Sequence, residues 1–399
     1  MSLTLRNARI VTPDGVVHGD LSIEDGRIAA IDARAADEST SASGEPAGAG
    51  ASEPTATDAS EATGSIDDLG GAWLVPGFVD IHVHGGGGAT YTTGDADEAR
   101  EAARFHLRHG TTTTLASLVT SPPELMRSAT AAYAPLVEEG VIAGIHYEGP
   151  YLSRARCGAQ NPDHLRDPDL DELATLVKVG DGAIRLITVA PELPGALQAI
   201  EWLVDHNVTV AIGHTDATYQ QARDGIAAGA TVATHLFNGM RQPHHREPGP
   251  VYALLDAPEV VVELIADGVH LHDGTLRFAA RSAGPARTAL ITDAISAAGM
   301  PDGSYELGGL GVTVADGVAR LTDGGSIAGS TLTMDAAFRR AVHAGLSMTD
   351  AARMAATTPA TALGFTDRGA IAPGKRADLV VLDDDLTVTR VMRAGVWVS

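Results

Sequence analysis

From residue 72 to residue 292 the chain alternates short apolar runs with amphipathic stretches. The apolar runs read as buried strands and the amphipathic stretches as helices. Helix-like segments include residues 96–109, 123–139, 195–207 and 218–228. Eight alternations predict an α/β chain folded as a (β/α)8 TIM-type barrel. The expected strands are residues 72–83, 112–119, 141–147, 184–189, 208–213, 230–235, 260–266 and 288–292.

Both ends of the chain favour small β-structures. Short strand-like runs separated by turn dipeptides fill residues 1–32, and the same pattern returns in residues 369–399. We expect the two groups to pair into one small β-sandwich beside the barrel. The predicted domains are therefore residues 1–71 (first part of the sandwich), 72–366 (the barrel) and 367–399 (second part of the sandwich).

Two segments interrupt this plan. Residues 33–65 consist largely of Ala, Ser, Glu, Gly, Thr and Pro, with almost nothing to bury, so we expect a disordered loop without a function of its own. Residues 299–325 are rich in glycine with strand-like pieces, which indicates a β insertion in the barrel. Two helices are expected after it, at residues 332–344 and 349–356.

A pair of histidines, His82 and His84, ends the first apolar run and is followed by the four glycines 85–88. Side chains alternate along a strand, so a strand that continued through this pair would present both imidazoles on one face. Neutral imidazole is a good ligand for zinc, iron and similar cations. The pair by itself is equally compatible with two hydrogen-bonded structural histidines.

Polar residues end several of the other predicted strands, and in a barrel of this kind the catalytic residues lie at the carboxyl-terminal strand ends. Histidines and carboxylates from separate strands converge naturally on a metal centre. Asp293, at the last strand end, could both touch a metal and accept a proton from water. The residues concerned are His146, Glu148, His214, His235, Asp267, His270 and Asp293.

Composition narrows the classes of partner. The formal net charge of −23 argues against binding to nucleic acid or to an anionic membrane. We find no apolar run long enough for a membrane helix and no signal peptide. The single cysteine, Cys157, excludes an intrachain disulfide and fits a reducing compartment, so we expect a cytoplasmic protein.

Several motifs together resemble the amidohydrolase superfamily and, within it, the N-acetylglucosamine-6-phosphate deacetylase family. The resemblance covers nearly the whole chain apart from residues 33–65. HxH and ADLVVLD are general to the superfamily, whereas HxEGP, THLFNxM and ADGxH together are far more specific. The motifs are PGFVDIHVHGGGG from Pro76, HYEGPYL from His146, IGHTDAT from Ile212, THLFNGM from Thr234, REPG from Arg246, ADGVHL from Ala266, TDA from Thr292, AGSTLTMD from Ala328 and PGKRADLVVLD from Pro373.

The resemblance implies a metal-dependent hydrolase that converts N-acetyl-D-glucosamine 6-phosphate to D-glucosamine 6-phosphate and acetate. It implies one or two divalent ions per subunit, most often zinc, with iron, manganese, cobalt or cadmium as alternatives. Glu148, His214 and His235 would form the first metal site, and His146 would support the site rather than bind metal. His82 and His84, with Glu148 bridging and Asp293 nearby, would form the second. Asp293 would act as general base and then as general acid.

The resemblance also implies a substrate site. His270 would be catalytic and contact the sugar or its acetamido group, and Asn238 and Gly239 would hold the phosphate. Arg246 would reach the phosphate from the neighbouring subunit of a homodimer. Arginine suits this role because its planar guanidinium matches the geometry of phosphate. The remaining substrate-binding residues would be Ala159, Gln160, Gly268, Ile327, Ala328 and Gly329.

One position departs from the family pattern, which has a histidine where this chain has Gln160. Glutamine donates a hydrogen bond but cannot become cationic, so we expect Gln160→His to raise the turnover number. Three other functions stay open at this stage. They are deacetylation of the galactosamine epimer, hydrolysis of another cyclic amide, and an inactive binding protein built on the same fold.

Overall fold

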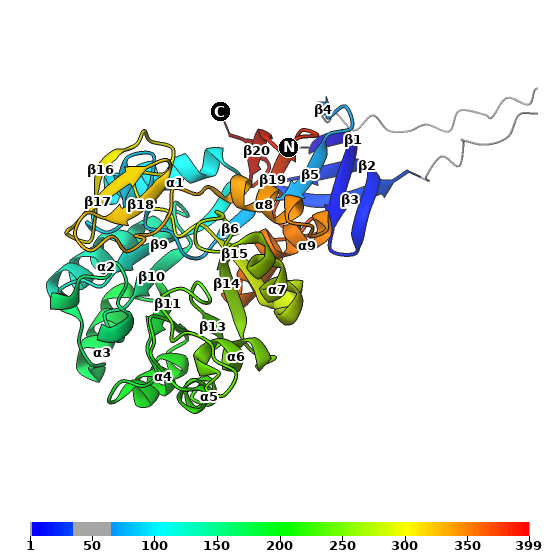
Figure 1. The fold of residues 1–399 in the computed structure, drawn as a ribbon. Coiled ribbons are helices and arrows are strands. Elements are labelled where there is room, and N and C mark those ends of the chain that lie inside the picture. The colour runs from blue at the N-terminus through cyan, green and yellow to red at the C-terminus, as the bar shows by residue number, and fades with distance from the viewer. Residues whose placement is uncertain (1, 35–64, 399) are drawn as a thin grey trace, which may run out of the picture.

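The structure, a computed structural model, describes residues 2–34 and 65–398. Most of the loop predicted over residues 33–65 therefore lies outside the described residues, and its two ends belong to strands. Figure 1 shows two bodies, a barrel ringed by helices and a smaller group of strands beside it that holds both chain ends. Within the described ranges, no helix has the length and apolar character needed to cross a bilayer.

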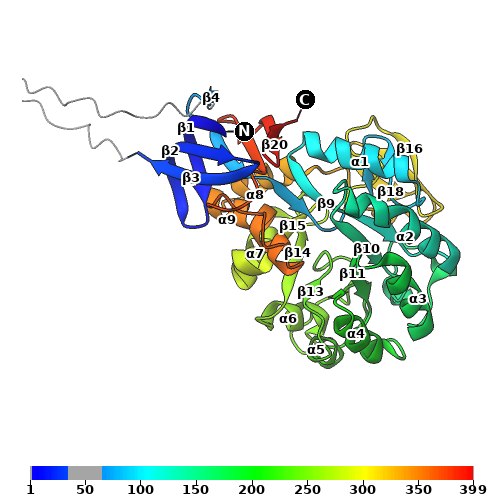
Figure 2. The ribbon, with the colours of Figure 1, turned by 180° about the vertical axis from the view of Figure 1, so that it is seen from behind.

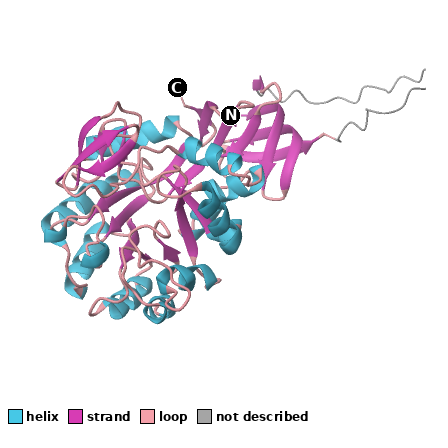
Figure 3. Ribbon diagram, in the orientation of Figure 1, coloured by secondary structure: helices cyan, strands magenta, loops and turns pink. Residues whose placement is uncertain are grey.

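The barrel expected from the alternation is confirmed. Its eight strands pair in parallel and follow one another in chain order around the sheet, with helices on the outside (Figure 3). The strands are β6 (Phe78–Asp80), β9 (Thr111–Val119), β10 (Gly144–Glu148), β11 (Ile184–Val189), β12 (Thr209–Ile212), β13 (Val232–Ala233), β14 (Val261–Ile265) and β15 (Thr288–Ile291).

The first and last strands meet through a short set of hydrogen bonds. The Asp80 carboxylate at the end of β6 accepts a bond of 2.6 Å from the Thr292 hydroxyl. Just beyond the strands, the Asp293 N–H donates to the carbonyl of His82 at 2.9 Å. Complete burial raises the pKa of Asp80 to about 7. These contacts hold the segment that carries His82 against the segment that carries Asp293.

The helices begin where capping residues predict. Asp95 and Asp169 each accept two backbone N–H groups at the start of a helix, and Thr218 forms a capping box with Gln221. The helices predicted at 96–109, 123–139, 195–207, 218–228 and 332–344 are present within two residues at each end. The helices are α1 (Ala96–Arg108), α2 (Pro123–Glu138), α3 (Leu170–Gly180), α4 (Ala196–Asp205), α5 (Tyr219–Ala227), α6 (Gly249–Asp256), α7 (Asp273–Ala283), α8 (Met334–His343), α9 (Met348–Ala352) and α10 (Thr358–Ala362).

Short non-α turns complete the helical layer. Three are 3₁₀ turns, and a π-helical segment joins α9 to α10, so the helix predicted at 349–356 is present but changes from α to π at Arg353 and continues to Ala362. These turns are η1 (Arg154–Arg156), η2 (Pro162–His164), η3 (Pro285–Arg287) and η4 (Arg353–Thr357).

The prediction of one strand over residues 72–83 is wrong. The run divides at Gly77 into β5 (Trp73–Pro76), which pairs with β1 and β19, and β6 in the barrel. Gly77 is required there because a Cβ would come within 2.3 Å of the Thr112 hydroxyl. His82 and His84 consequently lie beyond the end of β6 rather than on one face of a strand. The glycines after them form a hairpin of β7 (Gly85–Gly86) and β8 (Ala89–Thr90).

The terminal strands form one hydrogen-bonded sheet with an apolar core of its own, built around residues such as Leu5, Ile10 and Leu379. Figure 2 shows the amino-terminal strands beside the carboxyl-terminal ones. Because β5 belongs to this sheet, we propose that the first domain boundary lies at Gly77 rather than at residue 72. The other strands of the sheet are β1 (Ser2–Thr12), β2 (Gly15–Glu24), β3 (Arg27–Ala33), β4 (Ser65–Asp68), β19 (Leu379–Leu382), β20 (Val388–Arg393) and β21 (Val396–Trp397).

The glycine-rich insertion is a three-stranded antiparallel sheet, as the sequence predicts. It consists of β16 (Gly303–Leu307), β17 (Leu310–Ala315) and β18 (Val318–Leu321). Its buried residues pack on Val119, the last residue of β9, and on Ile295 after β15. The insertion therefore covers part of the carboxyl-terminal face of the barrel.

Candidate metal centre and substrate cavity

Four residues predicted to form the site follow strand ends at the same face of the barrel. Glu148 is the last residue of β10, and His214, His235 and Asp293 each lie two residues beyond β12, β13 and β15. These last three have positive φ values of 45°, 28° and 51°. A left-handed backbone is costly for residues other than glycine and persists where the surrounding structure imposes it. The side chains at these three positions converge on Glu148 and on the residues around it.

The first group of side chains meets at one oxygen of Glu148. His214 Nε2 lies 2.9 Å from Glu148 Oε1, and His235 Nε2 lies 2.8 Å from the same oxygen. The two imidazole nitrogens are 3.1 Å apart. All three side chains are buried, so the structure brings together the residues predicted for the first metal site.

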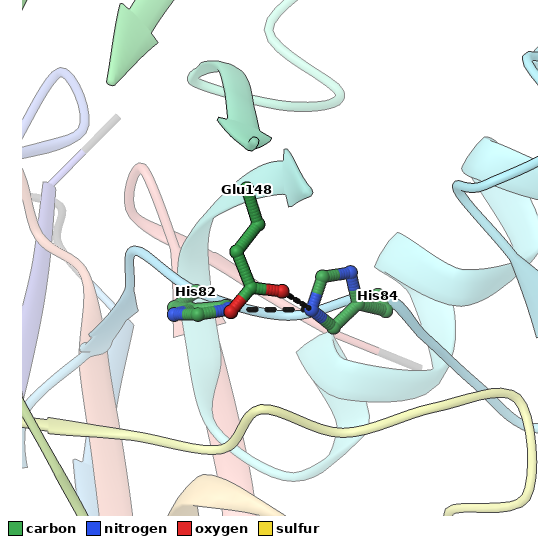
Figure 4. Close-up of side chains that lie close together, drawn as sticks. All are labelled: His82, His84 and Glu148. Atoms are coloured by element: carbon green, nitrogen blue, oxygen red, sulfur yellow. Dashed lines mark hydrogen bonds and ion pairs between the residues drawn. The ribbon is translucent and has the colours of Figure 1, made fainter. Parts of the chain in front are cut away.

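The second group borders the same carboxylate (Figure 4), with His82 Nε2 at 3.5 Å from Oε1. The Nε2 atoms of His82 and His84 are 3.2 Å apart, and His84 Nε2 lies 3.3 Å from Glu148 Oε2. Asp293 Oδ1 lies 3.5 Å from His82 Nε2 and 3.2 Å from His84 Nε2. Glu148 thus stands between the two groups, and Asp293 borders the second.

The rear nitrogen of three of these rings has a partner of its own. His82 Nδ1 lies 3.1 Å from the Glu263 carboxylate, His84 Nδ1 lies 3.1 Å from the Ser117 carbonyl, and His214 Nδ1 lies 2.9 Å from the Arg156 carbonyl. A ring that donates through Nδ1 has its Nε2 lone pair free for a cation. Converging, buried imidazole and carboxylate donors of this kind fit a divalent transition metal.

The charges at the site support the same interpretation. Burial alone would raise the pKa of Glu148, yet the charges of His82 and His214 outweigh burial and hold that pKa well below its usual range. For His84, burial lowers the pKa, but its bonds to Asp293 and Glu148 prevail and raise the pKa to about 9. The centre therefore combines ionised carboxylates with rings that favour a positive charge, which is what a bound cation would supply.

His146 supports the site, as expected. Its Nδ1 lies 2.9 Å from the Ser117 hydroxyl and its Nε2 lies 3.0 Å from the Thr188 hydroxyl. Burial, together with the positive charge of His82, holds its pKa well below the usual range. Both nitrogens are thus engaged by neutral partners, and the ring packs edge-on against His82 at a centroid distance of 4.6 Å.

A cavity of ≈ 260 Å³ opens directly on this centre. Seven of the predicted substrate-binding residues line it, and the insertion supplies Leu307 as part of its wall. Gly268 and Ala328 are not among the described residues that line the cavity. Besides the metal-centre residues His84, Glu148, His214, His235 and Asp293, the lining consists of Gly158, Ala159, Gln160, Asn238, Gly239, His270, Leu307, Ser326, Ile327 and Gly329.

The remaining predicted residues have distinct surroundings. His270 is fixed by Asp267, whose carboxylate lies 2.6 Å from its Nδ1. Gly268 has a φ of +78° and lies against Arg340, whose guanidinium would meet a Cβ at 2.1 Å. Arg246 is exposed, and its Nη1 lies 2.7 Å from His245 Nε2 within the same loop.

Sequence reasoning missed one residue of the centre, Glu263. It is fully buried in β14, where one carboxylate oxygen faces His82 and also accepts the His235 N–H at 3.1 Å. The signal was present, because a carboxylate inside a predicted buried strand requires a partner. Nothing in the sequence, however, indicated that this partner would be His82, 181 positions away.

Comparisons with known proteins identify the family of the chain. The sequence profile of the Amidohydrolase family matches residues 73–398. An N-acetylglucosamine-6-phosphate deacetylase of Lysinibacillus sphaericus is 36% identical over 83% of this chain and 87% of that protein. An N-acetylgalactosamine-6-phosphate deacetylase of Escherichia coli O157:H7 is 37% identical over 99% of both chains.

A solved structure is similar over the whole chain. It is a variant of N-acetyl-D-glucosamine-6-phosphate deacetylase from Mycobacterium smegmatis in complex with N-acetyl-D-glucosamine 6-phosphate. The two chains are 44% identical and superpose with a TM-score of 0.89, covering 100% of this chain and 98% of the other.

Proposed function

The chain belongs to the amidohydrolase family, and we propose that it hydrolyses the acetamide of N-acetyl-D-glucosamine 6-phosphate to D-glucosamine 6-phosphate and acetate, a step of amino-sugar catabolism. Relatives named for this reaction match most of the chain. The observation that carries the proposal is the buried Glu148–His214–His235 group, which opens on a cavity that Asp293 and His270 also line.

A divalent metal is part of this proposal. Glu148, His214 and His235 would hold a first ion, and His82 and His84, with Glu148 and Asp293, would hold a second. When bound, such a metal polarises a carbonyl oxygen and makes water nucleophilic near neutral pH. The mixture of imidazole and carboxylate donors suits zinc best, and the same donors accept iron, manganese, cobalt or cadmium.

Asp293 would carry the proton. Burial would raise its pKa, but the charge of His82 and the bond from His84 lower it, so Asp293 is a carboxylate at neutral pH. It would accept a proton from the water that attacks the acetamide carbon. It would then deliver that proton to the nitrogen as the C–N bond breaks, which releases acetate and the amine.

The cavity walls would recognise the sugar. His270 lines the cavity with Nδ1 held by Asp267, so Nε2 remains for the substrate. Burial alone lowers the pKa of His270, but the bond to Asp267 outweighs burial and raises it, which favours a cationic donor toward an oxygen atom. Asn238 and Gly239, at the rim after β13, would bind the phosphate.

We propose a homodimer in which Arg246 completes the phosphate site of the partner. Its exposed loop position supports this, as does its contact with the ring of His245 rather than with a carboxylate among the described residues. The chain carries a net charge of −23, so a phosphorylated substrate needs a local cation. Mixing Glu148→Gln protein with Arg246→Ala protein should restore activity in mixed dimers, since one site would then be complete. No recovery after subunit exchange would contradict the shared site.

Acetate release tests the reaction. N-acetylglucosamine 6-phosphate and unphosphorylated N-acetylglucosamine are compared before chelation, after chelation and after return of metal. Release from the phosphorylated sugar alone, lost on chelation and regained with metal, is the expected result. No release from the phosphorylated sugar by metal-loaded protein would refute the proposal.

The galactosamine epimer is the second candidate substrate. The relative from Escherichia coli O157:H7 named for that epimer matches 99% of this chain. Comparing kcat/KM for the two 6-phosphates decides between them. An inactive binding protein is disfavoured by the intact ligand set.

We also propose that the protein works in the cytoplasm. The support is compositional: a chain with a single cysteine has no intrachain disulfide that an oxidising compartment would preserve. Fractionation of cells that produce the full chain would test this location.

A further inference from the structure

Gln160 lies on the loop after β10, and both ends of its side-chain amide are engaged. The Thr120 N–H donates to Gln160 Oε1 at 2.7 Å, and Gln160 Nε2 lies 2.6 Å from Glu148 Oε2. The residue is 4% exposed. A backbone N–H can only donate, so Thr120 determines which end of the amide is the oxygen. The amide NH₂ must therefore face Glu148 and donate to it.

This contact makes the two oxygens of Glu148 unequal. Oε1 lies within 2.9 Å of the imidazole nitrogens of His214 and His235. Oε2 is the oxygen nearer His84, at 3.3 Å, and it already accepts the amide of Gln160. His82 Nε2 lies 3.5 Å from Oε1, so a cation of this group that bound Glu148 on the His84 side would meet an oxygen that has committed a lone pair to a donor.

The amide NH₂ of Gln160 also stays a donor when a metal binds. Thiol, imidazolium and carboxyl donors lose a proton when a metal binds, but the amide of glutamine keeps its hydrogens over the working pH range. The partial positive charge of the N–H group therefore stays beside the second ligand group. Withdrawing it would break the bond to Oε2, since Thr120 holds the other end of the amide.

We propose that Gln160 is a positioning residue that makes the two metal-ligand groups unequal in affinity. It holds Glu148 so that Oε1 serves the His214–His235 group, and it weakens metal binding at the His82–His84 group by occupying Oε2. This inference rests on the metal-dependent function proposed above. Metal then binds at the His214–His235 group before it binds at the His82–His84 group.

The decisive variant is Gln160→Glu. Its side chain keeps an oxygen for the Thr120 N–H and replaces the NH₂ that faces Glu148 with a second oxygen. Gln221→Glu is the matched control, because Gln221 also accepts a backbone N–H through Oε1, from Thr218, but lies on the outer helix α5. Both substitutions add one negative charge to the chain, and only one of them changes the donor to Glu148.

The measurement is a Co²⁺ titration of the metal-stripped full chain by calorimetry, with bound metal counted by elemental analysis. In the wild type we expect a tight first step and a weaker second step. Gln160→Glu should tighten the second step by about 10-fold or more, the scale of partners behind metal ligands, and change the first by less than about threefold. A second step that appears only in Gln160→Glu supports the inference equally.

Gln160→Met is a second variant, which removes the donor without adding charge. It should tighten the second step by a smaller factor, and circular dichroism checks that it folds with the Thr120 N–H unpaired. Three results would overturn the inference: an unchanged second step in Gln160→Glu, equal tightening in Gln221→Glu, or parallel weakening of both steps.

Acetate release separates this inference from the proposed reaction. Two unequal metal-binding steps without acetate release would support the role of Gln160 and refute the proposed reaction. Acetate release by a wild-type protein that binds two metal ions with equal affinity would support the reaction and refute the role of Gln160.

Discussion

The two ligand groups share Glu148 but are held by different parts of the fold. His214 and His235 follow neighbouring strands, β12 and β13, at backbone positions that the barrel imposes. His82 and His84 follow β6, where the barrel closes on β15. The ring of His82 is held in addition by the buried carboxylate of Glu263. The backbone therefore positions the first group, whereas in the second group the ring of His82 also has a buried carboxylate behind it.

Glu148→Gln should break both groups at once. The shared carboxylate loses its charge, so bound metal should fall and kcat/KM should drop by on the order of 10³-fold or more, because the several kcal/mol supplied by the metal are lost. Acetate release and elemental analysis measure the two effects. Glu201→Gln on the outer surface of α4 is the control and should match the wild type; full metal content in Glu148→Gln would contradict the shared role.

Asp293→Asn should separate chemistry from metal binding at the first group. The amide cannot accept a proton from water, so kcat should fall by about 10²- to 10⁴-fold. Because the Asp293 carboxylate makes its ion-pair contacts in the centre with His82 and His84, the first metal step should keep most of its affinity. A variant that loses the first metal together with activity would show that Asp293 supports both groups.

Glu263→Gln should weaken the second group selectively. The amide can still contact His82 and accept the His235 N–H, but the negative charge behind the His82 ring is gone. We expect the second metal step to weaken by about 10- to 100-fold and the first to change little. Calorimetric titration measures both affinities. Equal weakening of the two steps would contradict a role of Glu263 in the second group alone.

Asp267 lies outside both metal-ligand groups, so Asp267→Asn should have the smallest effect on metal affinity. Burial opposes both charges, but their mutual bond prevails, lowering the pKa of Asp267 and raising that of His270. The stabilisation from Asp267 is present above its unfolded pKa and is lost as the pH falls through its lower folded pKa. The stabilisation from His270 is present below its unfolded pKa and is lost as the pH rises through its higher folded pKa.

The pair therefore stabilises the fold most between about pH 4 and 6.5, the two unfolded values. Asp267→Asn should cost about 2 kcal/mol in that window, and the cost should shrink above the folded pKa of His270. Urea unfolding across pH measures this. Both metal steps should stay unchanged, and a cost that grows at high pH would contradict the pairing.

Much of the centre was predictable because strand ends of a barrel share one face. Glu148, His214, His235 and Asp293 each follow an apolar run, and eight such runs place them together before any contact is known. The pair His82 and His84 was identified for a partly wrong reason. The strand that was expected to align the two rings stops at Asp80, and hydrogen bonds across the barrel seam align them instead.

The sequence by itself determined the barrel, the paired terminal strands, the insertion and most of the side chains that meet at the candidate centre, because periodicity and motif spacing are local properties of the chain. Only the tertiary structure decided that Glu263 stands behind His82 and that Gln160 lies between Thr120 and Glu148. Such contacts join residues from different strands and loops. Each contact requires the two side chains to be placed to within about an ångström, and only the packing of the whole barrel places them so closely.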